Sequence, residues 1–336
     1  MFDGLNSASC SQMPKVLLTG GTGFVGRPLL EALATAKYPV VSVTRKSPPI
    51  TLCGVHSYVL PIFSDSNNWD VPLKGVEVVI HSAGRVHIMN EVHSNPLQAF
   101  REVNVGATLN LARQAAEAGV KRFIFISSVK VNGEETGRNR AFKPSDAPAP
   151  LDDYGVSKLE AEQALMALAK QTAMSVTIIR PVLVYGPGVK ANFEKMLAAI
   201  DKGLPLPFRT INNRRSLVFI DNLIDLILLC IHHPKAANRI FLVSDGEDLS
   251  IGQILQKLAV AMNKKTPIFA CPQFILELAA SVVGKKEFFQ RLCGSLQVDI
   301  SDTRQLLGWS PPIGIDEAFA ITARYYKEKK SGIPYG

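Results

Sequence analysis

The chain has 336 residues, of which 47% are hydrophobic and 20% charged, a composition typical of a folded globular protein with one large or two modest domains. The formal net charge of +8 suits an anionic ligand, but no basic stripe with interleaved aromatic residues occurs, so we expect no nucleic-acid partner. The cysteines are scattered, odd in number and without a Cys-x-x-Cys pair, which favours a reduced cytoplasmic location over a disulfide scaffold or a zinc site: Cys10, Cys53, Cys230, Cys271 and Cys293.

Two segments bear on targeting. Residues 1–13 lack the apolar core of a signal peptide, and we expect them to be a disordered leader. The most apolar later stretch, 217–231, is interrupted by Asp221, Asn222 and Asp225 and is too short to span a bilayer. We therefore expect no membrane insertion.

The first motif is a glycine-rich turn. An apolar run over 16–18 leads into Gly20, Gly23 and Gly26, and leucines at helical spacing follow. Strand, glycine turn and helix in this order form the first unit of a dinucleotide-binding βαβ fold. Side chains at these glycines would block the tight turn and the close approach of backbone to pyrophosphate. The helix that begins near Phe24 directs its free N–H groups and positive dipole end at the phosphates.

Further apolar segments predict strands that alternate with helices, and hence a doubly wound, Rossmann-like parallel sheet: 40–43, 58–60, 76–81, 123–126, 176–179 and 240–243. We predict a dinucleotide-binding domain over 14–185 plus 218–245. A smaller substrate domain is predicted over 186–217 plus 246–330, where the strand–helix alternation breaks. Ligands bind at the carboxyl ends of parallel strands, which places Ser128 at the right edge of the sheet.

Between these strands, 97–118 predicts one long helix with Asn104 midway, and the proline-rich segment 134–153 predicts a loop. Asp152 or Asp153 is expected to cap a helix over 154–170.

The end of the second predicted strand indicates the cofactor. An acidic residue there would bind the adenosine ribose hydroxyls of NAD, whereas an arginine accommodates the 2′-phosphate of NADP. Arg45 and Lys46 supply two cations and no carboxylate. This favours NADP(H), but an arginine can also stack on adenine, so NAD(H) stays open.

Tyr154 and Lys158 are candidate catalytic residues. Their spacing of four at the start of a predicted helix points both side chains the same way. A phenol with a pKa near 10 is a poor acid–base group at neutral pH, and a nearby ammonium is expected to lower that pKa. The hydroxyl of Ser128, upstream on the same sheet edge, can hold the oxygen that Tyr154 would protonate.

These motifs are followed by Arg180-Pro181-x-x-x-Tyr185-Gly186-Pro187-Gly188, and together they occur in the order seen in extended short-chain dehydrogenases/reductases. From Lys15 to about Tyr326 the chain resembles that family's NAD-dependent epimerases and dehydratases. The resemblance implies that Ser128 and Tyr154 bind and protonate a sugar oxygen and that Lys158 also grips the nicotinamide ribose; Ser127 is expected to be structural. It implies these cofactor-binding residues: Gly20, Gly23, Phe24, Val25, Gly26, Arg45, Ala83, Tyr154, Lys158 and Pro181.

The resemblance also implies a UDP-sugar substrate. The residues that would bind it are Ser128, Asn192, Leu206, Phe208, Arg215 and, with a surface role as the alternative, Arg291. A guanidinium such as that of Arg215 suits a diphosphate. The segment 307–312 resembles a C-terminal packing signature. Relatives often form homodimers through two helices, here 97–118 and 154–170, although the apolar faces of these helices could equally pack within one chain.

Several positions depart from parts of the family. Many 4-epimerases carry a tyrosine where this chain has Asn132 and an acidic residue where it has Arg45, and the acidic pair of dehydratases is replaced by Val129 and Lys130. The segments 85–89 and 129–134 resemble UDP-4-keto-6-deoxy-N-acetylhexosamine 4-reductases of surface polysaccharide synthesis. That activity, with NAD(P)H, is the expected function. The alternatives are a UDP-N-acetylhexosamine or UDP-hexose 4-epimerase with tightly bound NAD, and a non-enzymatic NADP-sensing or scaffold protein. His87 and the other histidines are expected in loops or on the surface, without metal-ligand spacing.

Overall fold

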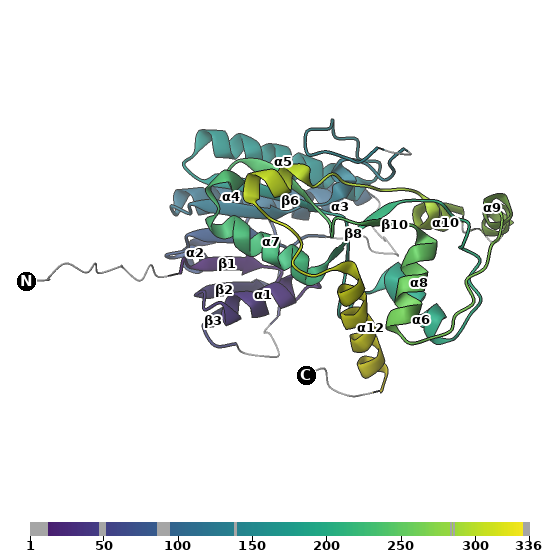
Figure 1. Cartoon of the computed structure of the whole chain (residues 1–336). Coiled ribbons are helices and arrows are strands. Elements are labelled where there is room, and N and C mark those ends of the chain that lie inside the picture. The colour runs from purple at the N-terminus through teal and green to yellow at the C-terminus, as the bar shows by residue number, and fades with distance from the viewer. Residues whose placement is uncertain are drawn as a thin grey trace, which may run out of the picture.

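The computed structural model describes residues 13–46, 52–85, 95–137, 140–282, 284 and 286–331. Within them, a parallel sheet of seven strands has the order β3-β2-β1-β4-β5-β6-β9 (Figure 1). The strands are β1 Val16–Thr19, β2 Val40–Thr44, β3 Val55–Val59, β4 Val78–His81, β5 Arg122–Ile126, β6 Ser175–Pro181 and β9 Arg239–Val243. Each overlaps a predicted segment, and the doubly wound Rossmann-like fold is confirmed. The 1–12 part of the expected leader and His87 lie outside the described residues.

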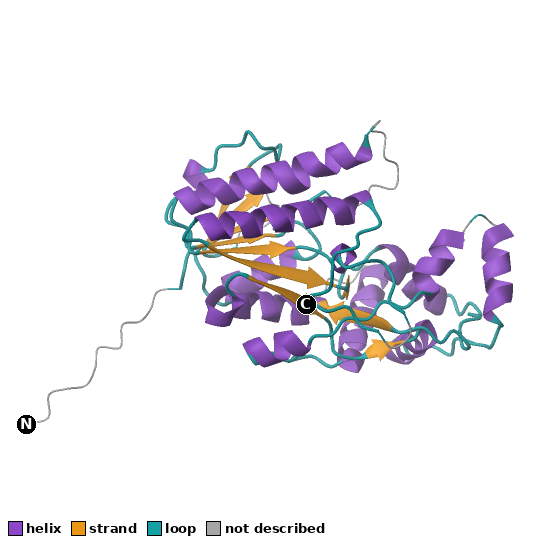
Figure 2. Cartoon of the chain, turned by 90° about the horizontal axis from the view of Figure 1, so that it is seen from above, coloured by secondary structure: helices purple, strands orange, loops and turns teal. Residues whose placement is uncertain are grey.

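Helices cover both faces of this sheet, which is why its central strands are largely apolar. On β1, Val16 and Leu18 belong to one core cluster and Leu17 to the other. The first cluster packs against α1 (Gly26–Thr35) and α7 (Ile220–His232), which contact each other. The second packs against α2 (Asp70–Leu73), α4 (Thr108–Glu117) and α5 (Asp153–Gln171). Figure 2 shows two long helices on one side of the sheet and further helices on the other.

The long helix predicted over 97–118 contains an irregular turn. It consists of α3 (Pro96–Arg101), a π-helical segment (Glu102–Ala107) and α4. Asn104 lies in the π-helical segment and is buried. The start of α5 is as predicted, because the side chain of Asp152 caps it by accepting a hydrogen bond from Gly155 N at 2.7 Å.

A second lobe is built from segments before and after β9 and contains elements that we did not predict as strands. β7 (Leu183–Tyr185), β8 (Arg215–Phe219) and β10 (Asp248–Leu249) form a three-stranded sheet in the order β10-β8-β7. Around it are helices α6 (Ala191–Asp201), α8 (Ile251–Ala261), α9 (Gln273–Val282), α10 (Lys286–Cys293) and α12 (Ile315–Ser331). Helix α11 (Ser301–Leu307) instead packs against β9 of the large sheet. Figure 1 shows α9 at the end of the molecule farthest from β1–β3. The predicted division into two domains stays a prediction.

The chain after α10 connects this lobe to the loop that follows β5. Thr136 N donates to Ser295 O and Phe142 N to Gln297 O, both at 2.8 Å. On its other side the same segment pairs with β8, where Ser216 N donates to Leu296 O at 2.8 Å. The predicted loop 134–153 is therefore held against the second lobe by backbone hydrogen bonds. Among the described helices, none has both the length and the apolar character needed to cross a membrane.

Candidate active site

The glycine turn between β1 and α1 has the geometry of a dinucleotide cradle. Gly20 has a φ of +78°, and a Cβ built there would lie 2.7 Å from Ala83 N. A Cβ on Gly26 would lie 2.0 Å from Gly20 O. Only glycine fits both positions. Gly20 adopts a left-handed backbone conformation, and a side chain at either position would collide with backbone atoms. The turn leads directly into the N-terminus of α1, where an anion such as a pyrophosphate is favoured, so these residues fit a dinucleotide.

The other predicted cofactor residues lie at the same edge of the sheet. Phe24 and Val25 are in the turn before α1, Arg45 is exposed directly after β2, and Pro181 is buried at the end of β6. Ala83 follows β4, and its N–H donates to Thr19 Oγ1 at 3.2 Å. All of them therefore sit at the carboxyl ends of parallel strands, where ligands of such folds bind.

The three predicted catalytic residues come from β5 and α5. Ser128 follows β5 in extended conformation and begins a 3-10 turn, Val129–Val131. Lys158 is buried, and its ammonium donates to Ile126 O at 2.9 Å, which fixes it at the carboxyl end of β5. The same Nζ lies 5.9 Å from the centroid of the Tyr154 ring. The structure thus brings the phenol, the ammonium and the strand end that precedes Ser128 together.

Burial sets the protonation of this pair. It raises the pKa of Tyr154 to about 12, and the negative charge of Asp152 adds to the increase. Burial also lowers the pKa of Lys158 to about 8, which the carboxylate of Glu162 partly opposes. The expectation that Lys158 lowers the pKa of Tyr154 is therefore wrong for the chain without a cofactor, because loss of water around the phenol outweighs the ammonium.

The ammonium of Lys130 connects the Ser128 turn to the start of α5. It forms ion pairs with Asp152, the cap of α5, and with Glu134 at 3.1 Å. Gly155 packs directly against this turn, since a Cβ on it would lie 3.0 Å from Lys130 O. In the sequence, Lys130 was noted as a departure from the dehydratase pattern and as part of the segment 129–134 that resembles 4-reductases, with no pairing role. The opposite charges at 130, 134 and 152 were a visible signal, but their pairing depends on the loop path.

A buried polar network supports the site from behind. Arg180 donates to both carboxylate oxygens of Glu162, with Nη2 to Oε2 at 2.5 Å, and its Nη1 donates to Asn132 Oδ1 at 2.9 Å. Ser127 also donates to Glu162. Asn132 therefore takes part in this network, which gives a structural reason for an asparagine where many 4-epimerases carry a tyrosine. The prediction that Ser127 is structural agrees with this position.

His81 contradicts the expectation that the histidines lie in loops or on the surface. It is fully buried in β4, where Thr19 Oγ1 lies 2.7 Å from its Nδ1 and Thr108 Oγ1 lies 2.9 Å from its Nε2. Burial, and then the charge of Lys158, lower its pKa to about 3, so the ring is neutral. Two hydroxyl partners make a strand position possible for this polar ring.

Asn104 is a site residue that sequence reasoning named without a role. Its Oδ1 accepts from Arg85 N at 2.8 Å, and its Nδ2 donates to Arg85 O at 3.1 Å and to Ser157 Oγ at 3.0 Å. It thereby fixes the backbone after β4, opposite Gly84, to the helix that carries Lys158. An asparagine inside a predicted helix was the available signal, since π-turns often mark functional sites.

The predicted substrate residues are spread over the second lobe. Asn192 is half-buried near the start of α6, and Leu206 and Phe208 lie in the loop that pairs with 267–269, with Leu206 N donating to Pro267 O at 2.9 Å. Arg215 begins β8, and its Nη1 donates to Gly294 O at 2.9 Å. Burial lowers the pKa of Arg215, while Cys293 and Glu135 oppose the change. The side chain of Arg291 lies outside the described part of the structure.

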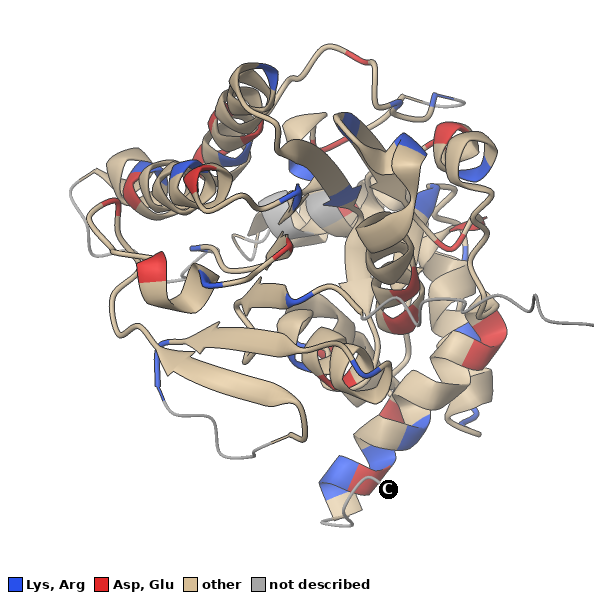
Figure 3. Ribbon diagram, turned by 90° about the vertical axis from the view of Figure 1, so that its left-hand side faces the viewer, with Lys and Arg blue, Asp and Glu red and all other residues tan. Residues whose placement is uncertain are grey.

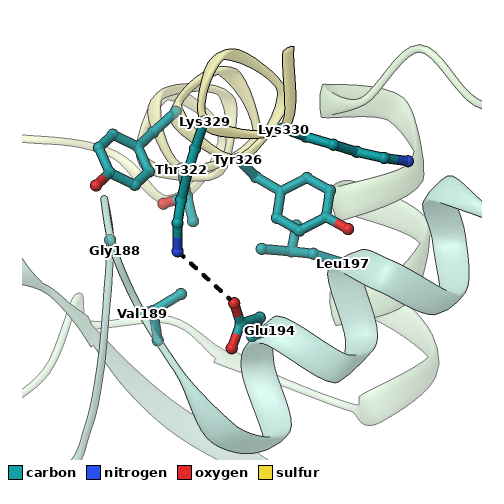
Figure 4. A pocket seen from close by; sticks show the side chains of 10 residues that line it. Gly188, Val189, Glu194, Leu197, Thr322, Tyr326, Lys329 and Lys330 are labelled. Atoms are coloured by element: carbon teal, nitrogen blue, oxygen red, sulfur yellow. Dashed lines mark ion pairs between the residues drawn. The ribbon is translucent and has the colours of Figure 1, made fainter. Parts of the chain in front are cut away.

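Two cavities open in the second lobe. One of about 280 Å³ lies between the Gly186–Gly188 turn, α6 and α12, where Lys329 approaches Glu194 at 4.0 Å (Figure 4). The other, about 440 Å³ and polar, is lined by the loop 209–214 and the start of α8. None of the described residues lining them is Ser128, Tyr154 or Lys158.

Figure 3 shows Lys and Arg interspersed with Asp and Glu along α12. Within the described residues, no cluster of His, Cys, Asp or Glu could hold a metal ion.

Comparison with known proteins adds the family. A profile described as "NAD dependent epimerase/dehydratase family" matches residues 16–252. The chain is 48% identical to a UDP-glucose 4-epimerase of Vibrio cholerae over 94% of this chain and 96% of that protein. It is 26% identical to an N-acetyl-alpha-D-glucosaminyl-diphospho-ditrans,octacis-undecaprenol 4-epimerase of Escherichia coli O157:H7, covering 92% and 94%. The solved structure of MoeE5 with UDP-glucose and NAD superposes with a TM-score of 0.74 at 22% identity, covering 94% and 99%.

These findings correct the predicted reaction. The similarity to a UDP-glucose 4-epimerase at 48% identity contradicts the 4-keto sugar reductase and favours the alternative, a 4-epimerase. The physical reason for the error is that both reactions use the same serine, tyrosine and lysine. The segments that suggested a reductase, 85–89 and 129–134, do not decide whether the keto sugar is released or reduced again in place. With a matching family profile over more than half of its length, the chain belongs to the NAD dependent epimerase/dehydratase family, whose cofactor is NAD(P).

Proposed function

We propose that this protein interconverts the C4 epimers of a UDP-hexose or UDP-N-acetylhexosamine. The observation that carries the proposal is the buried ammonium of Lys158, held at 2.9 Å on Ile126 O and 5.9 Å from the Tyr154 ring, at the edge where the glycine turn fits a dinucleotide. The similarity to a UDP-glucose 4-epimerase at 48% identity supports the same reaction.

In this proposal Tyr154 moves the proton and Ser128 holds the sugar oxygen. The phenolate of Tyr154 accepts the proton of the 4-hydroxyl as the C4 hydrogen leaves, and the same phenol returns it after the 4-keto sugar has turned its other face. Bound NAD supplies the hydride acceptor and donor, and the positive charge of its oxidised ring favours the phenolate. Lys158 adds to this effect, because an opposite charge nearby lowers the pKa of a phenol. Burial of both groups excludes water from the keto sugar.

Arg215 is proposed to contact the diphosphate of the substrate, with Leu206 and Phe208 next to the base and Asn192 nearby. Its half-buried guanidinium at the start of β8 supports this role, because a fork of N–H donors in a partly desolvated place suits phosphate oxygens. A homodimer through α3–α4 and α5 also remains a proposal. These helices pack together on one face of the sheet, which leaves their outer surfaces for a partner.

The direct test is to incubate the purified protein with UDP-glucose, and separately with UDP-N-acetylglucosamine, without added NAD(P) or NAD(P)H. The sugar products are then separated by chromatography. A 4-epimer with no net change in absorbance at 340 nm is expected, because the cofactor is regenerated in each cycle. The denatured protein should release NAD or NADP in near-stoichiometric amount. Net consumption of the reduced cofactor, or no epimer from either sugar, would contradict the proposal.

The Tyr154→Phe variant assigns the proton transfer. It should lose turnover by about 10²- to 10⁴-fold, while the dissociation constant for UDP-sugar stays within a few-fold. Tyr58→Phe, on the strand β3, is the matched control, because it removes a phenol outside the site. Full turnover in Tyr154→Phe would exclude this residue as the acid–base group.

A lipid-linked substrate is the second candidate. The relative named as an undecaprenyl-diphosphate-linked N-acetylglucosamine 4-epimerase shares 26% identity over nearly the whole chain. The observation that favours it is α9, on which Phe274 and Leu278 are 68% and 66% exposed. Comparing turnover of UDP-N-acetylglucosamine with that of a polyprenyl-diphosphate-linked N-acetylglucosamine distinguishes the two substrates.

A further inference from the structure

Helix α9 presents an apolar face that the rest of the described chain leaves uncovered. Within its ten residues, Gln273–Val282, no residue is buried. Phe274, Leu278 and Val282 follow one another at four-residue spacing and are 68%, 66% and 80% exposed, and Ile275 beside them is 44% exposed. Residues four apart lie on one side of a helix, so these side chains form one continuous stripe. We call this stripe the outward face of α9.

The opposite side of α9 attaches it to the protein. Leu276 and Ala280, again four residues apart, are partly buried and pack against the main hydrophobic core. An ordinary surface helix turns one apolar side inward and a polar side to water. In α9 the outward side is apolar as well, and the exposed polar residues Gln273, Glu277 and Ser281 lie between the two apolar sides. Exposed apolar patches of this kind mark contacts with partners or membranes.

The charges around α9 indicate what it contacts. The segment 263–293 has five basic residues and two acidic ones: Lys264, Lys265, Lys285, Lys286 and Arg291 against Glu277 and Glu287. Of the described side chains, Lys264 forms an ion pair with Asp201 at 3.1 Å, and Lys265 is exposed. So is Arg209, whose backbone N–H donates to Phe269 O at 3.2 Å and so places this cation on the loop next to α9. Phe269 is itself 46% exposed. An apolar stripe beside the exposed cations Lys265 and Arg209 complements an anionic lipid surface.

The position and size of α9 agree with such a contact. Figures 1 and 2 both show α9 at one end of the molecule, away from the seven-stranded sheet, so a flat surface can reach it. A ten-residue helix is about 15 Å long, half of the roughly 30 Å hydrocarbon core, so it can lie in the interface and not span it. Four apolar side chains also fall short of the roughly 20 residues per partner in a standard protein interface.

We propose that the outward face of α9 docks this protein on an anionic membrane surface. Phe274, Ile275, Leu278 and Val282 enter the boundary between headgroups and acyl chains, and the exposed cations Lys265 and Arg209 contact the anionic headgroups. The dinucleotide cradle and the proposed catalytic residues Ser128, Tyr154 and Lys158 lie in the other part of the chain. The inference rests on the geometry of α9 and not on the proposed reaction.

The test is sedimentation of the full-length protein with lipid vesicles, which needs no activity measurement. The wild type is expected to bind phosphatidylcholine vesicles that contain about 30% phosphatidylglycerol at about 0.1 M salt, and to bind far less at about 0.5 M salt, where charges are screened. The variant Phe274→Gln/Leu278→Gln/Val282→Gln should partition at least about tenfold less, because it loses the three apolar side chains that the membrane would bury. Val71→Gln, on α2 and 71% exposed in the wild type, is the matched control and should bind like the wild type.

Each other occupant of α9 gives a different result. No binding of the wild type to anionic vesicles, or equal binding by the triple variant, would overturn the proposal. If the triple variant instead converts a dimer to a monomer in light scattering while vesicles stay unbound, the face is a contact between copies, which also overturns it. If the variant raises the KM for UDP-sugar without affecting lipid binding, α9 closes over the substrate and the proposal is wrong. Normal epimerase activity in a variant that no longer binds lipid supports it.

Discussion

The ammonium of Lys130 and the carboxylate of Asp152 form an ion pair that joins the turn after Ser128 to the first turn of the helix carrying Tyr154. Glu134 accepts from the same ammonium at 3.1 Å. The pair therefore has two effects. It fixes the relative position of the two proposed catalytic residues, and it neutralises the carboxylate whose charge raises the pKa of Tyr154.

Replacing Lys130 with Met should therefore change the pH dependence of turnover. Without its partner, Asp152 opposes the phenolate more strongly, so the pKa of Tyr154 rises further and less of the reactive form exists at neutral pH. We expect turnover at pH 7 to fall about tenfold and its rise with pH to move up by about one unit. The measurement is kcat/KM from pH 6 to 10.

The conservative variant Lys130→Arg should restore most of the activity, because it keeps the charge. Lys121→Met, which removes the exposed pair with Glu77, is the control and should leave the profile unchanged. If kcat/KM of the Lys130→Met enzyme is lower at every pH while the pH profile keeps its position, Lys130 only holds the turn in place.

Glu162→Gln should strongly lower the unfolding free energy of the protein. Glu162 and Arg180 are both about 2% exposed, and removing one partner leaves a buried charge unpaired. The expected loss is about 3–5 kcal/mol of unfolding free energy, measured by denaturant titration. The double variant Glu162→Leu/Arg180→Met should be more stable than the single one.

The matched control for that experiment is Glu160→Gln, two residues earlier on α5. Its partner Arg101 is exposed, so the pair is screened by water and the unfolding midpoint should hardly move. Equal losses of unfolding free energy in Glu160→Gln and Glu162→Gln would mean that burial does not increase the contribution of the Glu162–Arg180 pair to stability.

His81 should make stability depend on pH. Its pKa is about 3 in the folded chain and near 6.5 when unfolded, so above pH 6.5 the ring is neutral in both states and its contribution is complete. Below pH 6.5 only the unfolded chain binds the proton, and the unfolding free energy should fall by up to about 1.4 kcal/mol per pH unit. Denaturant titrations at pH 7.5, 6.5 and 5.5 measure this slope.

His81→Gln should reduce that slope, whereas His56→Gln, which replaces an exposed imidazole on β3, should keep it. Should both variants keep the full slope, another buried group must carry it.

Arg45→Glu should change the cofactor preference. If Arg45 binds the 2′-phosphate from its exposed position after β2, the dissociation constant for NADPH should rise at least about tenfold and that for NADH should stay the same or fall. Fluorescence titration with both cofactors checks this, with the exposed Arg113→Glu on α4 as control. Equal weakening of both cofactors would mean that the guanidinium only stacks on adenine.

The sequence alone was sufficient for the parallel sheet. Runs such as Phe123–Phe125 are apolar at every position because helices cover both faces, so the sheet leaves a strong local signal. The glycine turn and the cap Asp152 were equally visible, since each depends on a few neighbouring residues. The short strands β7, β8 and β10 were missed, because two to five residues with partners far along the chain have no periodicity of their own.

Electrostatics of the site could only be decided by the tertiary structure. Local spacing placed Lys158 one turn from Tyr154 and suggested a lowered phenol pKa, but the fold buries the phenol and brings Asp152 beside it, which raises the pKa. In the same way, nothing near His81 in sequence shows that Thr19 and Thr108 will receive it inside the sheet. Sequence determines which groups are available within a few residues; desolvation and charge pairing depend on which distant segments meet, and only the folded chain fixes that.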